Sequence, residues 1–356
     1  MFFSKNKFLI ILIIIMNLVH AEKGFTIEPQ TEISGNWFLS YNYNHTKEFN
    51  KYGLKRGYFT IKTRLNDIFS TRYTQDITLD QEGGDAGNVE TRLKYLYIKA
   101  KMNQFKLLGK SYFEFGLVHR PWLDFDGGIN AYRVQGKMFA ERHGVVNSAD
   151  FGITYTGLLG DEINPRYQEK VSDEYPGKYG SFAIGIYNGG GYHAIEQNNN
   201  KTIEGRLTIR PFYQLLPGLQ LSYSGAYGKA NLPGNQADFV MNLFYISYES
   251  PIIVTTAQYY TGTGDYEGNY VDNNYNSKEN HGYSFFSEIM IPNTNFALMG
   301  RYDNFTSTHN DINREIIIGG IAYKFLDNKV LLDYNREQFE NDQTLDNFEI
   351  VLEISF

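Results

Sequence analysis

The chain has 356 residues and a formal net charge of −7, and it contains 29 Tyr, 26 Phe and 34 Gly but no Cys. The absence of cysteine excludes disulfides, thiolate catalysis and cysteine-based metal sites, and the acidic balance argues against nucleic-acid binding. No uninterrupted apolar run reaches the length of about 18 residues that a membrane-spanning helix needs.

Residues 1–21 have the parts of a secretory signal peptide. Lys5 and Lys7 form a positive region, residues 8–19 form a short and almost wholly apolar core, and Ala21 stands before the predicted cleavage site. The core is too short to span a bilayer comfortably, so we predict cleavage after Ala21, with an uncleaved anchor as the alternative. Loss of two lysines and no acid changes the net charge from −7 to about −9.

After this leader, segments of alternating apolar and polar residues follow one another to the end of the chain. Side chains of a strand point to opposite faces with a period of two, so this alternation predicts half-apolar strands. Sixteen such strands are predicted at residues 33–44, 54–65, 70–81, 90–101, 109–118, 150–156, 179–188, 202–212, 219–228, 238–248, 252–261, 282–292, 296–305, 314–325, 330–337 and 347–356. Within residues 90–101, the alternation places Leu93, Tyr95 and Tyr97 opposite Arg92 and Lys94.

The spacing of these strands favours a transmembrane barrel. A barrel hides its apolar half in alternation, and its aromatic residues form girdles at the two membrane surfaces. Bacterial single-chain barrels have even strand numbers, and the pattern fits 16 strands, with 14 and 18 as alternatives. We therefore predict an all-β fold, an antiparallel transmembrane β-barrel of about 16 strands that forms a single domain at residues 22–356. A barrel of this size without a plug encloses water.

Two stretches are notable among the predicted strands and connections. The last ten residues, NFEIVLEISF, alternate strictly and end on Phe356. They resemble the C-terminal signature strand of bacterial outer-membrane barrels, which implies export to that membrane, contact with its lipids and recognition of Phe356 by the barrel-assembly machinery. An ordinary edge strand is the alternative. Residues 158–177 form a polar connection on the predicted periplasmic side, where turns are normally short.

Several short motifs surround the predicted third outer loop, residues 119–147. They are Phe115-Gly116-Leu117 with Pro121 nearby, Phe139-Ala140-Glu141-Arg142 before Asp150-Phe151-Gly152, and Ile186-Tyr187-Asn188-Gly189-Gly190 leading to Gly205-Arg206 and Pro211. These motifs resemble the phosphate-selective porin O/P family. The resemblance implies a sixteen-stranded, typically trimeric porin whose third loop folds into the lumen and narrows it.

The same resemblance implies that cations line the pore. On the lumen wall they correspond to Lys62, Arg64, Arg72, Arg92, Lys94, Arg206 and Arg210. In the third loop the constriction corresponds to Arg120, Arg133, Lys137, Glu141 and Arg142. Fixed cations in a narrow passage favour anions because they are poorly screened there. For any single residue the alternative is that it faces water because lipid rejects it, by about 2–4 kcal/mol for Lys or Arg at mid-membrane.

Acidic residues argue against a pure anion channel. They occur in or beside the third loop and on the late strands, at Asp124, Asp126, Glu141, Asp150, Glu288, Asp333, Glu349 and Glu353. A basic wall that faces an acidic one orients polar solutes and does not select anions alone. We therefore expect a general or weakly selective porin for small hydrophilic solutes, with preference for phosphate-like anions as an option.

Other classes of function have less support. The histidines after the leader lie in or beside predicted loops, without the spacing of a metal-ligand motif or a nucleophile elbow. The DFDGG sequence at 124–128 lacks the remainder of a calcium loop, so a turn explains it better. We expect no enzyme activity, metal or cofactor. An outer-membrane hydrolase and an adhesin are the alternatives, although the polar loop at 262–281 is typical of a solvated connection.

Overall fold

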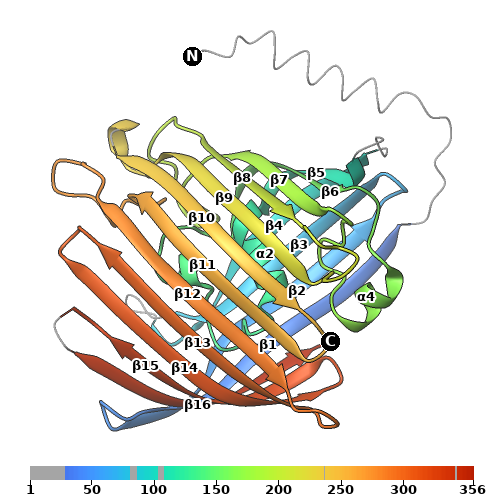
Figure 1. Ribbon diagram of the computed structural model, residues 1–356. Coiled ribbons are helices and arrows are strands. Elements are labelled where there is room, and N and C mark those ends of the chain that lie inside the picture. The colour runs from blue at the N-terminus through green and yellow to red at the C-terminus, as the bar shows by residue number, and fades with distance from the viewer. Residues whose placement is uncertain (1–28, 81–85, 103–107, 236, 341–342) are drawn as a thin grey trace.

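The computed structural model describes residues 29–80, 86–102, 108–235, 237–340 and 343–356, and the predicted signal peptide lies outside these residues. Within them, sixteen strands form one closed antiparallel barrel, in which each strand pairs with its neighbours in sequence and β1 pairs with β16 (Figure 1). The strands are β1 (Gln30–Asn44), β2 (Phe49–Arg64), β3 (Phe69–Leu79), β4 (Val89–Met102), β5 (Leu108–His119), β6 (Ala149–Leu159), β7 (Gly180–Tyr187), β8 (Thr202–Ile209), β9 (Leu219–Lys229), β10 (Asp238–Glu249), β11 (Ile253–Thr263), β12 (Glu279–Met290), β13 (Phe296–Ser307), β14 (Ile312–Phe325), β15 (Asn328–Gln338) and β16 (Thr344–Ser355).

Each predicted strand overlaps one observed strand, so the prediction of a sixteen-stranded antiparallel barrel is confirmed. The connections contain short helices, α2 (Pro121–Ile129), α3 (Phe139–Arg142), α4 (Pro165–Lys170) and the 3-10 turn η2 (Pro233–Asn235). Among the described residues, none of the helices has the length and apolar character required to cross a membrane.

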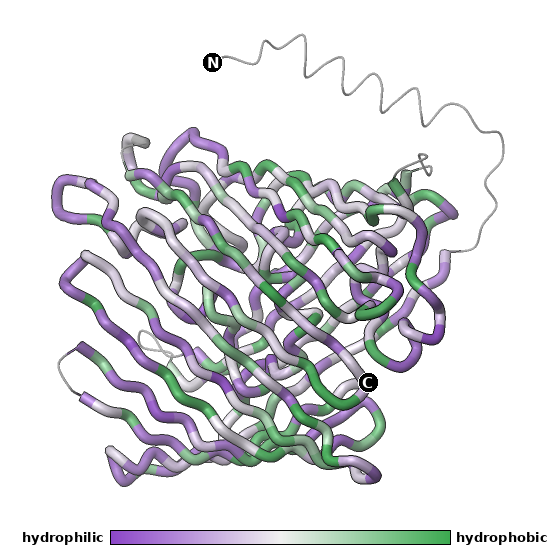
Figure 2. Tube along the Cα trace, viewed as in Figure 1, coloured by the Kyte–Doolittle hydropathy of each residue, from purple (hydrophilic) through white to green (hydrophobic). Residues whose placement is uncertain are grey.

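The strands present an apolar outer face. On β10, Phe244 and Ile246 are more than half exposed, whereas the intervening Tyr245 and the preceding Leu243 are buried on the inner side. Hydrophilic segments gather in the connections at the left edge of the barrel in Figure 2. The outer face therefore suits lipid, because an exposed apolar surface of this extent is unfavourable in water.

A glycine lies under the terminal aromatic ring at one end of the seam between β1 and β16. Gly35 of β1 and Phe356 exchange two backbone hydrogen bonds, with N···O distances of 2.9 and 3.1 Å. The Phe356 ring covers Gly35 so closely that an added Cβ atom would stand 2.4 Å from the ring. A side chain at residue 35 would therefore displace the terminal aromatic ring from the seam.

A β-bulge corrects one sequence-based prediction. Thr74 pairs with Tyr95 and Gln75 pairs with Leu93, so Lys94 is an extra residue in β4. A bulge places two residues opposite one and shifts the alternation beyond it. Tyr95 and Tyr97 therefore point inward and are buried, although simple alternation placed them on the outer face.

The third loop, residues 120–148, packs against the inner side of the barrel. Its Trp122 and Phe125 contact the ring of inward-pointing Tyr245, with centroids 5.0 and 6.2 Å apart, and Phe139 approaches Tyr260 at 6.4 Å. Helix α2 lies within the outline of the barrel in Figure 1. The main hydrophobic cluster of the protein is thus formed between this loop and the inner face of the wall.

The unusually long connection at residues 160–179 contains a capped helix and two buried side chains. The side chain of Asn164 accepts a hydrogen bond from the backbone N–H of Arg166 and caps α4, and Ile163 and Tyr167 are buried. The end of this connection reaches α2, where the Tyr175 hydroxyl donates to Asp124. We name residues 160–179 the inward turn, and these contacts explain why it is longer than an ordinary turn.

Candidate functional site: the charged lining of the barrel

A buried ion pair fixes the start of the third loop. Arg120 Nε donates to Glu204 Oε1 of β8 at 2.7 Å, and both residues are almost wholly buried. The Arg120 guanidinium also lies 5.9 and 5.8 Å from the ring centroids of Tyr187 and Tyr266. Arg120 was predicted to line the constriction, and this placement is wrong because the side chain points into the wall and anchors the loop there.

Two aromatic side chains from another loop hold the end of the third loop. The Tyr270 hydroxyl donates to the backbone oxygen of His143 at 2.6 Å, and Asn147 Nδ2 donates to the Tyr266 hydroxyl at 3.3 Å. Both tyrosines lie in the connection between β11 and β12, which the sequence predicted to be merely solvated. That prediction is wrong for these two residues, because they are buried against the third loop.

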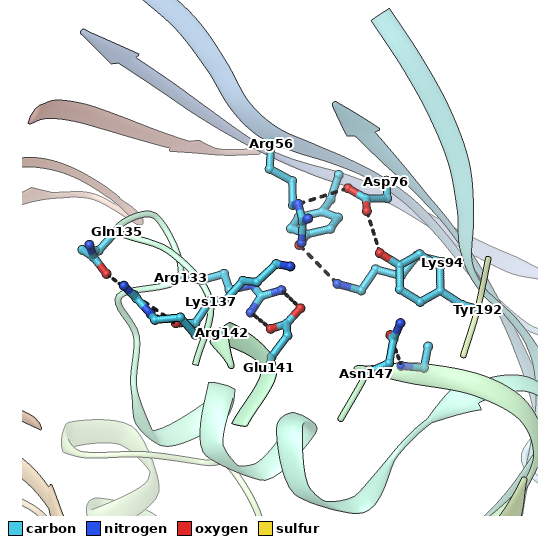
Figure 3. Close-up of polar contacts among 12 residues, drawn as sticks. Arg56, Asp76, Lys94, Arg133, Gln135, Lys137, Glu141, Arg142, Asn147 and Tyr192 are labelled. Carbon is cyan, nitrogen blue, oxygen red and sulfur yellow. Dashed lines mark hydrogen bonds and ion pairs between the residues drawn. The ribbon is translucent and has the colours of Figure 1, made fainter. Parts of the chain in front are cut away.

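The middle of the third loop carries most of its cations toward β2, β3 and β4. Figure 3 shows Arg133, Lys137 and Glu141 of the loop facing Arg56 and Lys94 of the wall. Arg133 makes a bidentate ion pair with Glu141, in which Nη2 lies 2.9 Å from Oε1. Lys137 is exposed, and among the described residues no acid lies within ion-pair distance of it.

Arg142 is held at the same part of the loop. Its Nη2 donates to the Gln135 side-chain oxygen at 2.7 Å, and its Nε lies 3.8 Å from Asp303. Asp303 is shared with Arg301, whose Nε lies 2.9 Å from both of its carboxylate oxygens. Arg142 therefore belongs to a partly neutralised network, and Lys137 is the more available cation.

The facing wall carries a cluster of cations around one acid. Asp76 is buried and accepts from Arg92 Nη2 at 3.3 Å and from the Tyr192 hydroxyl at 3.0 Å, and Arg56 Nε lies 3.4 Å from it. Lys94 Nζ donates to the Tyr58 hydroxyl at 3.2 Å. Arg56 and Arg92 thus share one carboxylate, and Lys94 makes no ion pair among the described residues, so this part of the wall is net positive. Arg56 and Tyr192 were not among the site residues predicted from the sequence.

Three of the four acids predicted on the late strands are matched by lysines, whereas Asp333 is buried and makes no ion pair among the described residues. Glu349 pairs with Lys55 at 2.5 Å, Glu353 pairs with Lys329 at 3.2 Å, and Glu288 pairs with Lys324. The sequence predicted an acidic set on these strands, and the three lysines that neutralise the glutamates lie on other strands. The third loop also rests here, since the Tyr132 hydroxyl donates to Glu288 at 2.9 Å and Arg301 Nη1 donates to the backbone oxygen of Lys137 at 3.2 Å.

Two predicted wall residues are covered rather than open to the lumen. Arg206 is buried under α2, 4.2 Å from the ring centroid of Phe125, and Arg210 is buried with its guanidinium on the backbone oxygen of Pro217. Lys62, Arg64 and Arg72 are on the inner face, near the end of the barrel that holds the inward turn. The prediction for Arg206 and Arg210 as lumen lining is therefore wrong, because the third loop and the turns cover them.

The predicted turn at residues 124–128 is instead part of helix α2, which begins at Pro121. Asp124 accepts from Tyr175, and Asp126 accepts from the Tyr245 hydroxyl at 3.2 Å, so neither carboxylate is arranged for a calcium loop. Among the described residues there is no group of three His, Asp or Glu side chains placed to hold a metal ion.

Neighbouring cations favour the ionised form of Glu141 in the third loop. Burial alone would raise the pKa of Glu141, but Arg133, Lys94 and Arg56 together outweigh burial and lower this pKa to about 2. His143 behaves differently, because burial, together with neighbouring cations such as Arg142, lowers its pKa to about 3. At neutral pH the loop therefore holds an ionised Glu141 and a neutral His143.

Comparison with known proteins shows the fold. No protein-family profile and no curated protein sequence matches the chain. Solved structures do match, among them OmpT, an outer membrane protein of Vibrio cholerae in a trimer form, with a TM-score of 0.61, 13% identity and coverage of 93% of this chain and 100% of that one.

Two other solved structures are similar over nearly the whole chain. An anion-selective porin from Comamonas acidovorans matches with a TM-score of 0.60 and 10% identity, covering 92% of this chain and 100% of that one. The outer membrane channel DcaP of Acinetobacter baumannii matches with a TM-score of 0.57 and 9% identity, covering 94% and 100%. The protein therefore has a porin-type fold. Membership of the phosphate-selective O/P family stays a prediction.

Proposed function

We propose that the protein is a bacterial outer-membrane porin through which small hydrophilic solutes diffuse passively, with a preference for anions. The carrying observation is that the third loop turns Lys137 and Arg133 toward Arg56 and Lys94 on the facing wall. Solutes pass between this loop and β2 to β4, and no cofactor or covalent step takes part.

The charge balance of this passage supports the anion preference. Six cations gather there, at Arg56, Arg92, Lys94, Arg133, Lys137 and Arg142, against three acids, Asp76, Glu141 and the shared Asp303. Because fixed charges are poorly screened in a narrow low-dielectric passage, a net excess of cations attracts anions and repels cations. The late-strand acids weaken this preference little, since each of Glu288, Glu349 and Glu353 has its own lysine.

The outer face and the chain end support the location and the partners. The apolar outer wall suits membrane lipid, and Phe356 is 61% exposed at the seam, where the assembly machinery could reach it. A homotrimer agrees with the trimer form recorded for the similar Vibrio cholerae barrel. Phosphate-like solutes stay an option that rests on the resemblance of the sequence motifs.

An adhesin or a hydrolase fits the site less well. The loop between β11 and β12 turns Tyr266 and Tyr270 inward onto the third loop, whereas an adhesin would present such side chains to a partner. His143, the histidine of the third loop, stacks on Phe305 with centroids 4.6 Å apart, and burial keeps it from water. That the protein lacks enzyme activity stays a prediction.

The direct test is a measurement of ion conductance and ion selectivity. The purified protein is inserted into a planar bilayer, single-channel conductance is recorded, and the reversal potential is measured under a KCl gradient. We expect discrete conductance steps and a reversal potential of the sign given by chloride preference. Absence of conductance would overturn the porin assignment, and a reversal potential of the opposite sign would overturn the anion preference.

A further inference from the structure

A chamber of about 940 Å³ lies inside the end of the barrel that holds the inward turn. The inner faces of β2 to β5 form one side of it, and α2 together with the inward turn forms the other. Lys62, Arg72 and Lys99 line the first side, and Asp124, Asp173 and Glu174 line the second. We call this cavity the lower chamber, and its size is in the range of sites for small molecules.

Positive charges are crowded on the wall side of the lower chamber. Lys62 and Arg72 are direct cross-strand partners of β2 and β3, an arrangement in which like charges destabilise a sheet, while Glu32 of β1 lies opposite Lys62 on its other side. Among the described residues, neither side chain makes an ion pair; Arg72 instead lies 4.7 Å from the ring centroid of Tyr95 and 3.1 Å from His119 Nε2. The wall therefore keeps two cations available to a solute.

Negative charges are crowded on the opposite side. Glu174 lies against α2, because a Cβ added to Gly128 would stand 3.2 Å from Glu174 Cγ. Within the described part of the chain, Asp173 and Glu174 make no ion pair, and Asp124 has only Tyr175 and, at 3.6 Å, His119. Burial, followed by the nearby Asp124 and Asp173, raises the pKa of Glu174.

The position of the acids is set by a specific brace. The Tyr175 ring packs against Phe125 of α2 at 5.6 Å between centroids, and the Arg206 guanidinium lies 4.6 Å from the Tyr175 centroid. These contacts hold the inward turn against the third loop, so Asp173 and Glu174 stay opposite the cations of β2 and β3. The two charged sides are therefore parts of one cavity, joined by these contacts, and not of independent surface loops.

We propose that the lower chamber binds zwitterionic solutes, amino acids and short peptides, with the carboxylate toward Lys62 and Arg72 and the ammonium toward Asp124 and Glu174. The proposal rests on the proposed porin function and names a solute class for it. A zwitterion neutralises both sides of the chamber at once. A simple anion leaves the acids uncompensated, and a simple cation leaves Lys62 and Arg72 uncompensated, so both bind less tightly.

The test uses the full-length channel in a planar bilayer at pH 7. Three solutes of similar size are added in turn on the side of the inward turn: diglycine, a zwitterion; N-acetylglycine, an anion; and glycinamide, a cation. We expect diglycine to reduce the ion current in a saturable manner, at concentrations about tenfold lower than the other two, as expected for one additional charged hydrogen bond.

Variants separate the two sides of the chamber. Glu174→Gln with Asp173→Asn, and separately Lys62→Gln, should each weaken the block by diglycine about tenfold. Glu169→Gln is the matched control, because Glu169 is an exposed acid of α4 that does not line the chamber. It should leave the block unchanged.

The outcomes distinguish the two proposals. A protein that conducts no ions would overturn the porin function itself. A conducting channel that diglycine does not block, or that N-acetylglycine blocks equally well, would overturn the zwitterion site and leave the porin function standing. An effect of Glu169→Gln as large as that of the chamber variants would also overturn the site, because it would show a general effect of surface charge.

Discussion

The wall formed by β2 to β5 and the wall formed by β12 to β16 both turn charged side chains inward, but they balance them differently. On the late strands each of three glutamates has a lysine partner, and the third loop rests on this wall through Tyr132 and the backbone of Lys137. On the early strands Arg56 and Arg92 share Asp76 and Lys94 donates to the Tyr58 hydroxyl, while Lys62 and Arg72 have no acid in ion-pair contact within the described residues. The difference indicates that the late wall supports the loop and the early wall meets the solute.

The largest effect is expected at the anchor that keeps the loop on its side of the barrel. Arg120→Met leaves Glu204 buried without its partner, which costs about 3–5 kcal/mol of stability. The midpoint of urea unfolding, followed by tryptophan fluorescence, should fall accordingly. The control is Lys110→Met, which breaks the exposed pair with Glu162 and should cost less than about 1 kcal/mol. Equal shifts would show that Arg120 anchors nothing.

The second-largest effect is expected on the ion selectivity of the channel. Replacing Arg133, Lys137 and Arg142 together by Ala removes three cations from the passage and should shift the reversal potential toward cations. The permeability ratio should change by at least about tenfold, because even one unit charge at about 10 Å contributes about 1.7 kcal/mol at an effective dielectric constant of about 20.

The control for this shift is a double variant that leaves the net charge of the passage unchanged. Arg133→Ala combined with Glu141→Ala removes one charge of each sign, so the reversal potential should stay close to that of the unmodified protein. An unchanged reversal potential in the triple variant would mean that the narrow part of the pore lies elsewhere.

Lowering the pH should raise the anion preference of the channel, as loss of Glu141 does, but by a smaller amount. The folded-state pKa of Glu141 is about 2, below its ordinary value of 4.5. Its ion pair with Arg133 is therefore complete above about pH 4.5 and is lost as the pH falls toward 2. Glu141→Gln should raise the anion preference at pH 7, and this variant should respond less than the unmodified channel when the pH is lowered from 5 to 2. Identical pH responses would exclude Glu141 as a contributor.

The smallest effect is expected at the brace between the inward turn and α2. Tyr175→Phe removes the hydrogen bond to Asp124 but keeps the ring on Phe125, so it should cost about 1 kcal/mol. The open-channel current should become noisier while its mean conductance stays the same. Tyr213→Phe, in a neighbouring turn outside the lower chamber, serves as the control. Equal noise in both variants would argue against the brace.

The barrel itself could be predicted from the sequence because alternation is a local property. Each of the sixteen strands has its own dyad pattern, and the order of the strands follows from pairing of sequence neighbours. The exception, at Tyr95 and Tyr97, arises because the bulge at Lys94 depends on how β4 pairs with β3. No pattern within β4 alone indicates that extra residue.

The site could be predicted only in part, because it depends on contacts between distant segments. Lys137 has the exposed position expected of a constriction residue, whereas Arg120 was assigned the wrong role since its partner Glu204 lies 84 residues further along the chain. The pairing of Lys55 with Glu349 joins the two ends of the barrel and was missed for the same reason. The length of the inward turn was the one signal in the sequence that could have indicated the lower chamber.

The central claim is that solutes meet the third loop from the side of β2 to β4. Because the chain contains no cysteine, Lys137→Cys and Lys329→Cys each carry a single thiol, one exposed and one buried against the late wall. An anionic methanethiosulfonate reagent, applied during single-channel recording, should reduce the current through the Lys137→Cys channel and leave the Lys329→Cys channel unchanged. Modification that reduces the current only in the Lys329→Cys channel would place the passage on the opposite side of the loop and contradict the account.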